Sequence, residues 1–143
     1  MTETKLKAVR FCKKYRYCSK LLVYHLQSLR GRTCDLEALN KQLAKKGGAV
    51  VGINSFTLDG DKTAISDAKN ILAKKGVTYK NIWFDSKSKA GEFTSGLYSY
   101  PTTYVVDKNG NIVGEPIVGA ITSEKQSEKL QKLIDQAIAN SKN

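Results

Sequence analysis

The chain has 143 residues, 41% of them hydrophobic, which suits one compact domain with a sizeable core. It contains no run of about 18 apolar residues, so the sequence predicts no membrane-spanning segment. The first ten residues lack an apolar stretch after their basic residues, and we therefore expect no signal peptide.

The net charge of +11 is distributed unevenly. Residues 1 to 33 hold nine lysines and arginines against the single acid Glu3, whereas the remaining 110 residues hold fifteen against twelve acids. The three cysteines, Cys12, Cys18 and Cys34, and the only histidine, His25, also fall within the first 34 residues. The composition therefore changes near Cys34, and an ordinary globular sequence follows.

The first three elements after Cys34 have clear periodicities. Residues 35 to 46 place Leu36, Leu39 and Leu43 on one helical face, and Gly47-Gly48 ends this helix. Residues 49 to 54 form a short β-branched run, typical of a strand buried on both faces. Residues 61 to 75 repeat the helical pattern and again end in Lys-Lys-Gly.

The second half continues with strands and two further helices. Residues 79 to 84 are predicted as a strand and residues 90 to 98 as a weaker helix. Residues 102 to 106 and 111 to 118 are predicted as two strands, because Asn109-Gly110 between them is a strong hairpin signal. Ser123 and Gln126 form a capping box for a last helix with an apolar stripe.

This element order predicts an α/β sandwich with a mixed β-sheet. Alternating helices and strands come first and an antiparallel pair follows them. One piece is missing, because a central strand before the first helix would complete a βαβ unit. We expect it within residues 15 to 25.

The most informative motif is a proline-led strand that runs into the hairpin, Ser99-Tyr100-Pro101-Thr102-Thr103-Tyr104-Val105-Val106-Asp107. It resembles the substrate-facing loop of thioredoxin-fold proteins. Together with three other stretches it makes residues 35 to 139 similar to the ResA/TlpA-type thiol-disulfide oxidoreductases. These stretches are Asp35-Leu36-Glu37-Ala38-Leu39-Asn40, Val50-Val51-Gly52-Ile53 and the inserted helix and strand of residues 61 to 84.

The resemblance implies a thioredoxin-like domain over residues 34 to 143, after an atypical basic segment of residues 1 to 33. It implies that Pro101 is a cis-proline and that Tyr100, Pro101 and Thr102 bind a polypeptide disulfide substrate. Such family members need no metal or other cofactor. They usually act outside the cytoplasm behind an N-terminal anchor, and we expect a monomer.

The family's Cys-x-x-Cys pair is absent from this sequence. Counted back without gaps from Asp35, the two family cysteines fall at Leu26 and Leu29. The family's glutamate falls at Arg32 and its proline at Cys34. None of the four matches, so the resemblance does not support dithiol catalysis by the chain as it stands.

A frameshift is one explanation of this mismatch. Reading the codons of residues 14 to 33 one base later permits the string NTDTVVNFWSTTCSPCVAEL, although codon degeneracy does not force it. The string would place a strand, Phe-Trp and Cys-Ser-Pro-Cys in the family register, with cysteines at positions 26 and 29. An out-of-frame segment was never selected to form a central strand, and we then expect residues 1 to 33 to be irregular or poorly packed.

The cysteines present have two further interpretations. Cys34 lies just before a helix, where a thiol pKa is lowered, so it is the candidate lone nucleophile; the alternative is an ordinary residue at the helix entry. Cys12, Cys18, His25 and Cys34 are the residue types of a zinc site, but they lack the short spacing of a cysteine pair. We therefore predict no metal site.

The basic, tyrosine-bearing run of residues 13 to 20 has the composition of a nucleic-acid contact, but a solvated or disordered arm is the preferred interpretation, and we expect no specific nucleic acid. Trp83 and Phe84 are predicted as core residues. Two functions remain: a thiol-disulfide oxidoreductase impaired by the missing cysteine pair, and a redox-silent module that binds extended polypeptides along the Pro101 edge.

Overall fold

The computed structural model describes the backbone of residues 22–27 and 34–140. Its elements alternate along the chain before an antiparallel pair and a final helix, which confirms the predicted α/β sandwich. In chain order they are β1 (Leu22–Gln27), α2 (Cys34–Lys45), β2 (Ala49–Asn54), the 3-10 segment η1 (Ser55–Gly60), α3 (Lys62–Lys74), β3 (Lys80–Ile82), α4 (Lys89–Ser95), β4 (Thr102–Val106), β5 (Ile117–Val118) and α5 (Glu124–Asn140).

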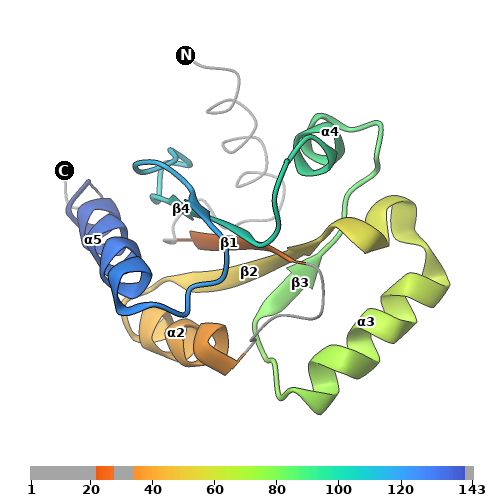
Figure 1. Cartoon of the computed structure of the whole chain (residues 1–143), viewed down its shortest axis with the longest axis horizontal. Helices are drawn as coiled ribbons and strands as arrows, with labels where there is room; N and C mark the ends of the chain where they lie inside the picture. Colours follow the sequence, from red (N-terminus) through yellow and green to blue (C-terminus); the bar gives the residue numbers. More distant parts are fainter. Residues whose placement is uncertain (1–21, 28–33, 141–143) are drawn as a thin grey trace.

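The five strands form one mixed sheet in the order β3-β2-β1-β4-β5. β1, β2 and β3 run parallel to one another, whereas β4 is antiparallel to β1 and to β5 (Figure 1). The carboxyl ends of β1, β2 and β3 therefore share one edge of the sheet with the amino end of β4. α3 and β3 supply the inserted helix and strand that the family resemblance implied.

The central strand occupies Leu22–Gln27, slightly later than the predicted range of 15 to 25. It pairs with β2 on one side and with β4 on the other. Without β1, the backbone N–H and C=O groups of β2 and β4 that face it would lose their hydrogen-bond partners. This requirement favours an extended conformation for residues 22 to 27. The expectation of an irregular segment is therefore wrong for these six residues, and the rest of residues 1 to 33 lies outside the described residues.

Glycine motifs end the first two described helices in the same way. At the end of α2, Gly48 N–H donates to the Leu43 carbonyl oxygen over 2.8 Å and Gly47, with φ +74°, donates to Ala44. This is a Schellman motif, which needs a residue that tolerates positive φ. The Lys-Lys-Gly sequence at the end of α3 forms the same motif, with Gly76 N–H donating to Ala73 and Val77 N–H to Leu72, so the repeated signal predicted both helix ends.

The core lies on both faces of the sheet. On one face, side chains of α2 and α5 pack against Val50 of β2 and Val105 of β4. On the other face, Val51 and Val106 pack with residues of η1, α4 and their neighbours. Figure 1 shows the same layers, with α2 and α5 on one side of the sheet and α4 on the other. Adjacent residues of one strand thus serve opposite faces, as the pleat requires.

The predicted strand of residues 111 to 118 is wrong in its middle. Ile112 forms an isolated bridge to Val106, and regular pairing resumes only in β5. Gly114 interrupts the strand with φ +65°, and a Cβ built there would lie 2.4 Å from Leu133 Cδ2 of α5. The backbone leaves the extended conformation where α5 packs closely against it.

Glu37 ties α2 to the segment before β3. Its buried carboxylate accepts hydrogen bonds from Thr78 N–H (2.7 Å), the Thr78 hydroxyl and Tyr79 N–H (3.4 Å). Burial acts to raise the pKa of this carboxyl, but the bonds from Thr78 and Tyr79 and the charge of Lys41 outweigh it, so the pKa lies below its usual value. Burial, and secondarily the Glu37 charge, raises the pKa of Tyr79 to about 12.

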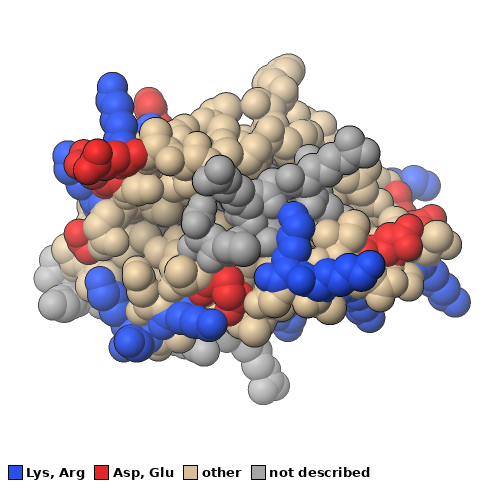
Figure 2. All heavy atoms as spheres, turned by 60° about the horizontal axis from the view of Figure 1, so that its bottom comes forward, with Lys and Arg blue, Asp and Glu red and all other residues tan. Residues whose placement is uncertain are grey.

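Acidic and basic side chains are interspersed over the face that Figure 2 shows, with no broad patch of one sign among the described residues there. This agrees with the near-balanced charge of the chain after residue 33. Within the described part of the chain, no helix combines the length and the apolar character needed to cross a membrane.

Candidate functional site

The loop that leads into β4 lies at the shared edge of the sheet. Its Tyr100–Pro101 peptide bond is cis. The Thr102 hydroxyl donates to the Ser99 carbonyl oxygen over 2.7 Å, and Gly119 N–H donates to the Pro101 carbonyl oxygen over 2.8 Å. The first bond stabilises the loop from within, and the second attaches it to the residue after β5.

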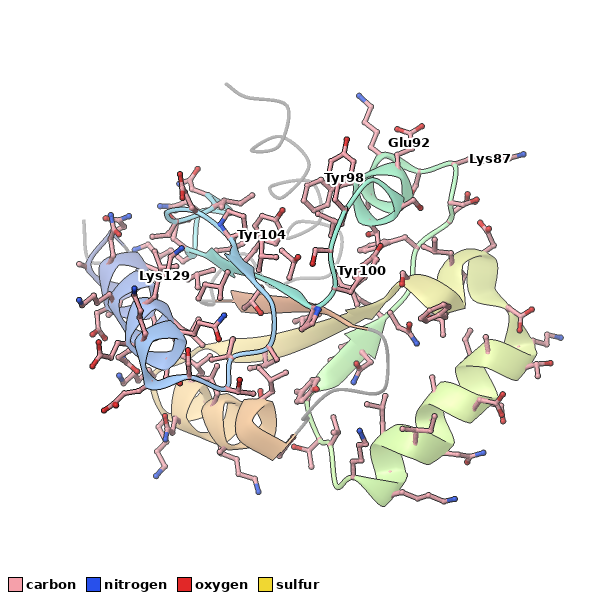
Figure 3. All side chains as sticks on the ribbon, viewed as in Figure 1. Lys87, Glu92, Tyr98, Tyr100, Tyr104 and Lys129 are labelled. Carbon is pink, nitrogen blue, oxygen red and sulfur yellow. The ribbon has the colours of Figure 1, made fainter. Side chains whose placement is uncertain are left out.

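α4 supports the loop from one face of the sheet. The Tyr100 hydroxyl donates to the Thr94 carbonyl oxygen of α4 over 2.7 Å. From the residue directly before Thr94, the Phe93 ring packs against the Tyr104 ring with centroids 5.6 Å apart, which attaches α4 to β4. Figure 3 shows Tyr98 and Tyr100 on the segment that connects these two elements. The side chain before Pro101 is thus anchored at its hydroxyl end.

β5 borders the loop on the other side. Val118 pairs with Thr102, and its side chain is exposed. Gly119 follows with φ +93°, a conformation that glycine adopts without strain, and this turn brings its N–H to Pro101. The site thus presents an exposed valine next to the loop that carries the exposed Tyr100.

The backbone register places Leu26, to which the family resemblance assigned the first cysteine, beside this loop. Leu26 of β1 pairs with Thr102 on one side and with Ile53 on the other, so it lies one residue from Pro101 in the register. Leu29, the second position, lies outside the described residues, as do Cys12 and Cys18. α2 begins at Cys34. The structure therefore brings together Leu26, Tyr100, Pro101 and Thr102 from the predicted site.

Exposed apolar side chains concentrate at this same edge. Within the described part of the chain, the large hydrophobic side chains that are exposed are Phe56, Trp83, Tyr98, Tyr100 and Val118. Phe56 follows β2, Trp83 follows β3, the two tyrosines precede β4, and Val118 is opposite Thr102. Since contiguous apolar surface marks interaction sites in soluble proteins, this edge is the candidate binding surface.

The prediction that Trp83 belongs to the core is wrong, whereas Phe84 is buried as predicted. Ile82 and Phe84 face the core cluster that contains Val51, so the residue between them points elsewhere. The exposure of Phe56 was not predicted. Its position in the sequence could have indicated it, because residues just after parallel strands lie at the edge where ligands bind in open α/β sheets.

The Asp59-Gly60-Asp61 turn serves structure. Asp61 caps α3, and Asp59 Oδ1 accepts the Ser86 N–H over 2.6 Å. That bond lowers the pKa of the Asp59 carboxyl. Among the residues that the structure describes, no group of three or more histidine, cysteine, aspartate or glutamate side chains is placed to hold a metal ion.

Neither a protein-family model nor a curated protein sequence matches the chain. Solved structures do match its fold. One is a Chlorobium tepidum protein provisionally named thiol:disulfide interchange protein DsbE, with 21% identity, a TM-score of 0.65, and coverage of 87% of this chain and 84% of that one.

Two further structures agree with it. A DsbF homologue from Corynebacterium diphtheriae shares 23% identity at a TM-score of 0.62, covering 85% of this chain and 74% of that chain. The thioredoxin domain of a thiol-disulfide oxidoreductase from Bacteroides vulgatus shares 14% identity at 0.62, covering 84% and 83%. At these identities the likeness is one of architecture, and it shows that the chain has the thioredoxin-like fold.

Proposed function

We propose that this protein is a thiol-disulfide oxidoreductase of the ResA/TlpA type, impaired in this chain because the Cys-x-x-Cys pair is missing. The observation that carries the proposal is the pairing of Leu26 with Thr102, because the family resemblance assigns the first cysteine to position 26 and Thr102 directly follows Pro101. The thioredoxin-like fold and the apolar edge around that loop support it. The partner is a polypeptide disulfide.

Tyr100, Pro101 and Thr102 form the substrate-binding half of the proposed site. A polypeptide that lies along this edge meets the half-exposed Tyr100 ring and the Val118 side chain. The loop is held by the Gly119, Thr94 and Ser99 hydrogen bonds before any ligand arrives. A preorganised surface loses less conformational entropy on binding, which favours extended, otherwise unstructured substrates.

Cys34 is the proposed nucleophile, because a helix N-terminus stabilises a thiolate and α2 begins at this residue. Its thiolate attacks one sulfur of a substrate disulfide, which forms a mixed disulfide and releases the other substrate sulfur as a thiolate. With no second cysteine three residues away, an external dithiol must complete the reaction. One of its thiolates attacks the Cys34 sulfur, which releases the second substrate sulfur as a thiolate and joins the dithiol to Cys34 by a disulfide bond. The other thiol of the dithiol then attacks its own sulfur in that bond, so the Cys34 thiolate is released and the dithiol leaves as an intramolecular disulfide.

The family resemblance also supports an extracytoplasmic, membrane-associated location, a monomer, and a division of the chain into an atypical segment of residues 1 to 33 and a domain of residues 34 to 143. Strand β1 would then be the part of the first segment that completes the domain's sheet.

Insulin reduction by dithiothreitol tests the proposal. We expect slow acceleration above the reagent alone, lost in Cys34→Ser and kept in Cys18→Ser. Acceleration that survives Cys34→Ser contradicts the role of Cys34. If no acceleration occurs but insulin still binds, the protein is instead a redox-silent polypeptide-binding module.

A further inference from the structure

The apolar edge extends well beyond the Pro101 loop. Phe56 is 68% exposed and Trp83 44% exposed, and both follow strands on the far side of β1 from β4. Ile53 pairs with Ile82, so the chain leaves β2 and β3 at neighbouring points. We call Phe56 and Trp83 together the aromatic shelf.

Backbone contacts hold the shelf in place. Asn54 Oδ1 accepts the Phe56 N–H over 3.0 Å, and the Thr57 hydroxyl donates to the Asn54 carbonyl oxygen over 3.1 Å, which sets the direction of η1 as it leaves β2. At its other end, Asp59 N–H donates to the Phe84 carbonyl oxygen over 2.9 Å. η1 is therefore bound to the last residue of β2 and to the segment that follows β3.

Gly60 packs against the Trp83 ring. A Cβ built on Gly60 would lie 2.7 Å from Trp83 Cη2, closer than real side-chain contacts allow, and Gly60 has φ +71°. A glycine at this place lets the backbone lie directly on the indole while nearly half of the indole side chain stays exposed. An aromatic side chain fixed in this way can contact a ligand at little entropic cost.

We infer that the aromatic shelf is a second subsite for the polypeptide proposed above, and that it takes an aromatic or large aliphatic side chain. This inference rests on the proposed function. The path from Pro101 to Trp83 crosses from β4 over β1 and β2 to β3. Three steps of about 4.8 Å make about 14 Å, which an extended peptide covers in about four residues.

The shelf favours an extended polypeptide over a compact ligand. It continues the same edge as Tyr100 and Val118, and exposed large hydrophobic side chains within the described residues occur only along that edge. A segment with two apolar residues far enough apart would cover both ends. A peptide whose two apolar residues are closer together than the distance from Pro101 to Trp83 would contact only one end of the edge.

Fluorescence gives a direct test, because Trp83 is the only tryptophan in the chain. The probes are labelled serine-rich peptides that carry a leucine and a phenylalanine separated by four residues, the same pair separated by one residue, and a peptide with serine in place of phenylalanine. Anisotropy measures the Kd, and Trp83 emission reports contact with the shelf.

We expect the long-spaced peptide to bind about tenfold more tightly than the phenylalanine-free peptide and to shift the Trp83 emission. Phe56→Ser should remove this gain, and Lys69→Ala, an exposed change on α3, should keep it. An equal gain from the short-spaced peptide would overturn the inference.

The Val118→Asp variant distinguishes a failure of the aromatic shelf from a failure of the proposed function. Suppose that all peptides bind, that Val118→Asp raises the Kd of each by the same factor, and that phenylalanine neither lowers the Kd nor shifts the Trp83 emission. The shelf is then not a subsite, and the proposed function stands. If no peptide binds and insulin does not bind, the proposed function fails and the inference fails with it.

Discussion

The Tyr100 hydroxyl donates a 2.7 Å hydrogen bond to the backbone carbonyl oxygen of Thr94, so the residue before Pro101 is attached to the last turn of α4. Thr94 belongs to the helix on one face of the sheet, and Tyr100 belongs to the loop at the edge of the sheet. The bond joins these two parts of the site, although the Tyr100 side chain remains partly exposed to solvent.

Replacing Tyr100 with phenylalanine removes this bond and keeps the ring. We expect a loss of about 0.5–1.5 kcal/mol in the free energy of unfolding, the usual contribution of one hydrogen bond, together with faster amide exchange around residues 99 to 102. Urea denaturation and hydrogen exchange measure the two effects. Tyr98→Phe is the matched control, because Tyr98 is fully exposed, and it should change neither.

Gly114→Ala tests why the second hairpin strand is interrupted. The substitution combines a positive φ with a Cβ 2.4 Å from Leu133 Cδ2, whereas Gly76→Ala combines a similar φ of +65° with open space. We expect Gly76→Ala to cost about 1–2 kcal/mol from the backbone alone and Gly114→Ala to cost about 1–3 kcal/mol more from overpacking. Equal losses in urea denaturation would show that α5 does not constrain this turn.

The fold and half of the site follow from local sequence signals. β2 and β4 have their predicted bounds, because the residues at their ends mark where each strand begins and ends. β2 is a compact β-branched run, and β4 is a run that begins after a proline and ends before Asn-Gly. The break at Gly114 could not be predicted, since its cause is Leu133, almost twenty residues away. Trp83 was misassigned because the sequence Ile-Trp-Phe does not tell which of its residues face the core.

Glu37 makes stability depend on pH. The folded-state pKa of its carboxyl is lowered, so its contribution is fully present above the usual value of 4.5 and is lost as pH falls through the folded-state pKa. Glu37→Gln should therefore lower the free energy of unfolding by about 1–3 kcal/mol at pH 7.

The difference between Glu37→Gln and the unchanged protein should shrink as pH is lowered from 5 towards 3. Denaturation curves across this range check the trend. The exposed Glu128→Gln is the control and should show no such dependence. A destabilisation by Glu37→Gln that stays constant with pH would mean that the charge of Glu37 is not what holds the Thr78 segment.

The DNA of the first forty codons tests the origin of the missing cysteine pair. We expect an open frame one base later across codons 14 to 33, with cysteine codons at positions 26 and 29. A stop codon in that frame, or other codons at those two positions, excludes a frameshift. Cys12, Cys18 and Cys34 would then be the thiols available for exchange, with Cys34 the proposed nucleophile.

Insulin reduction by a repaired chain shows whether the Pro101 edge can serve a thiol-disulfide exchange site. In this chain, residues 14 to 33 are replaced by NTDTVVNFWSTTCSPCVAEL and every other residue is kept. We predict that the repaired chain reduces insulin many times faster than the present chain, and that serine at position 26 removes the gain. A repaired chain that folds, as judged by circular dichroism, but shows no gain would contradict the claim that the Pro101 edge is the substrate half of a thiol-disulfide oxidoreductase site.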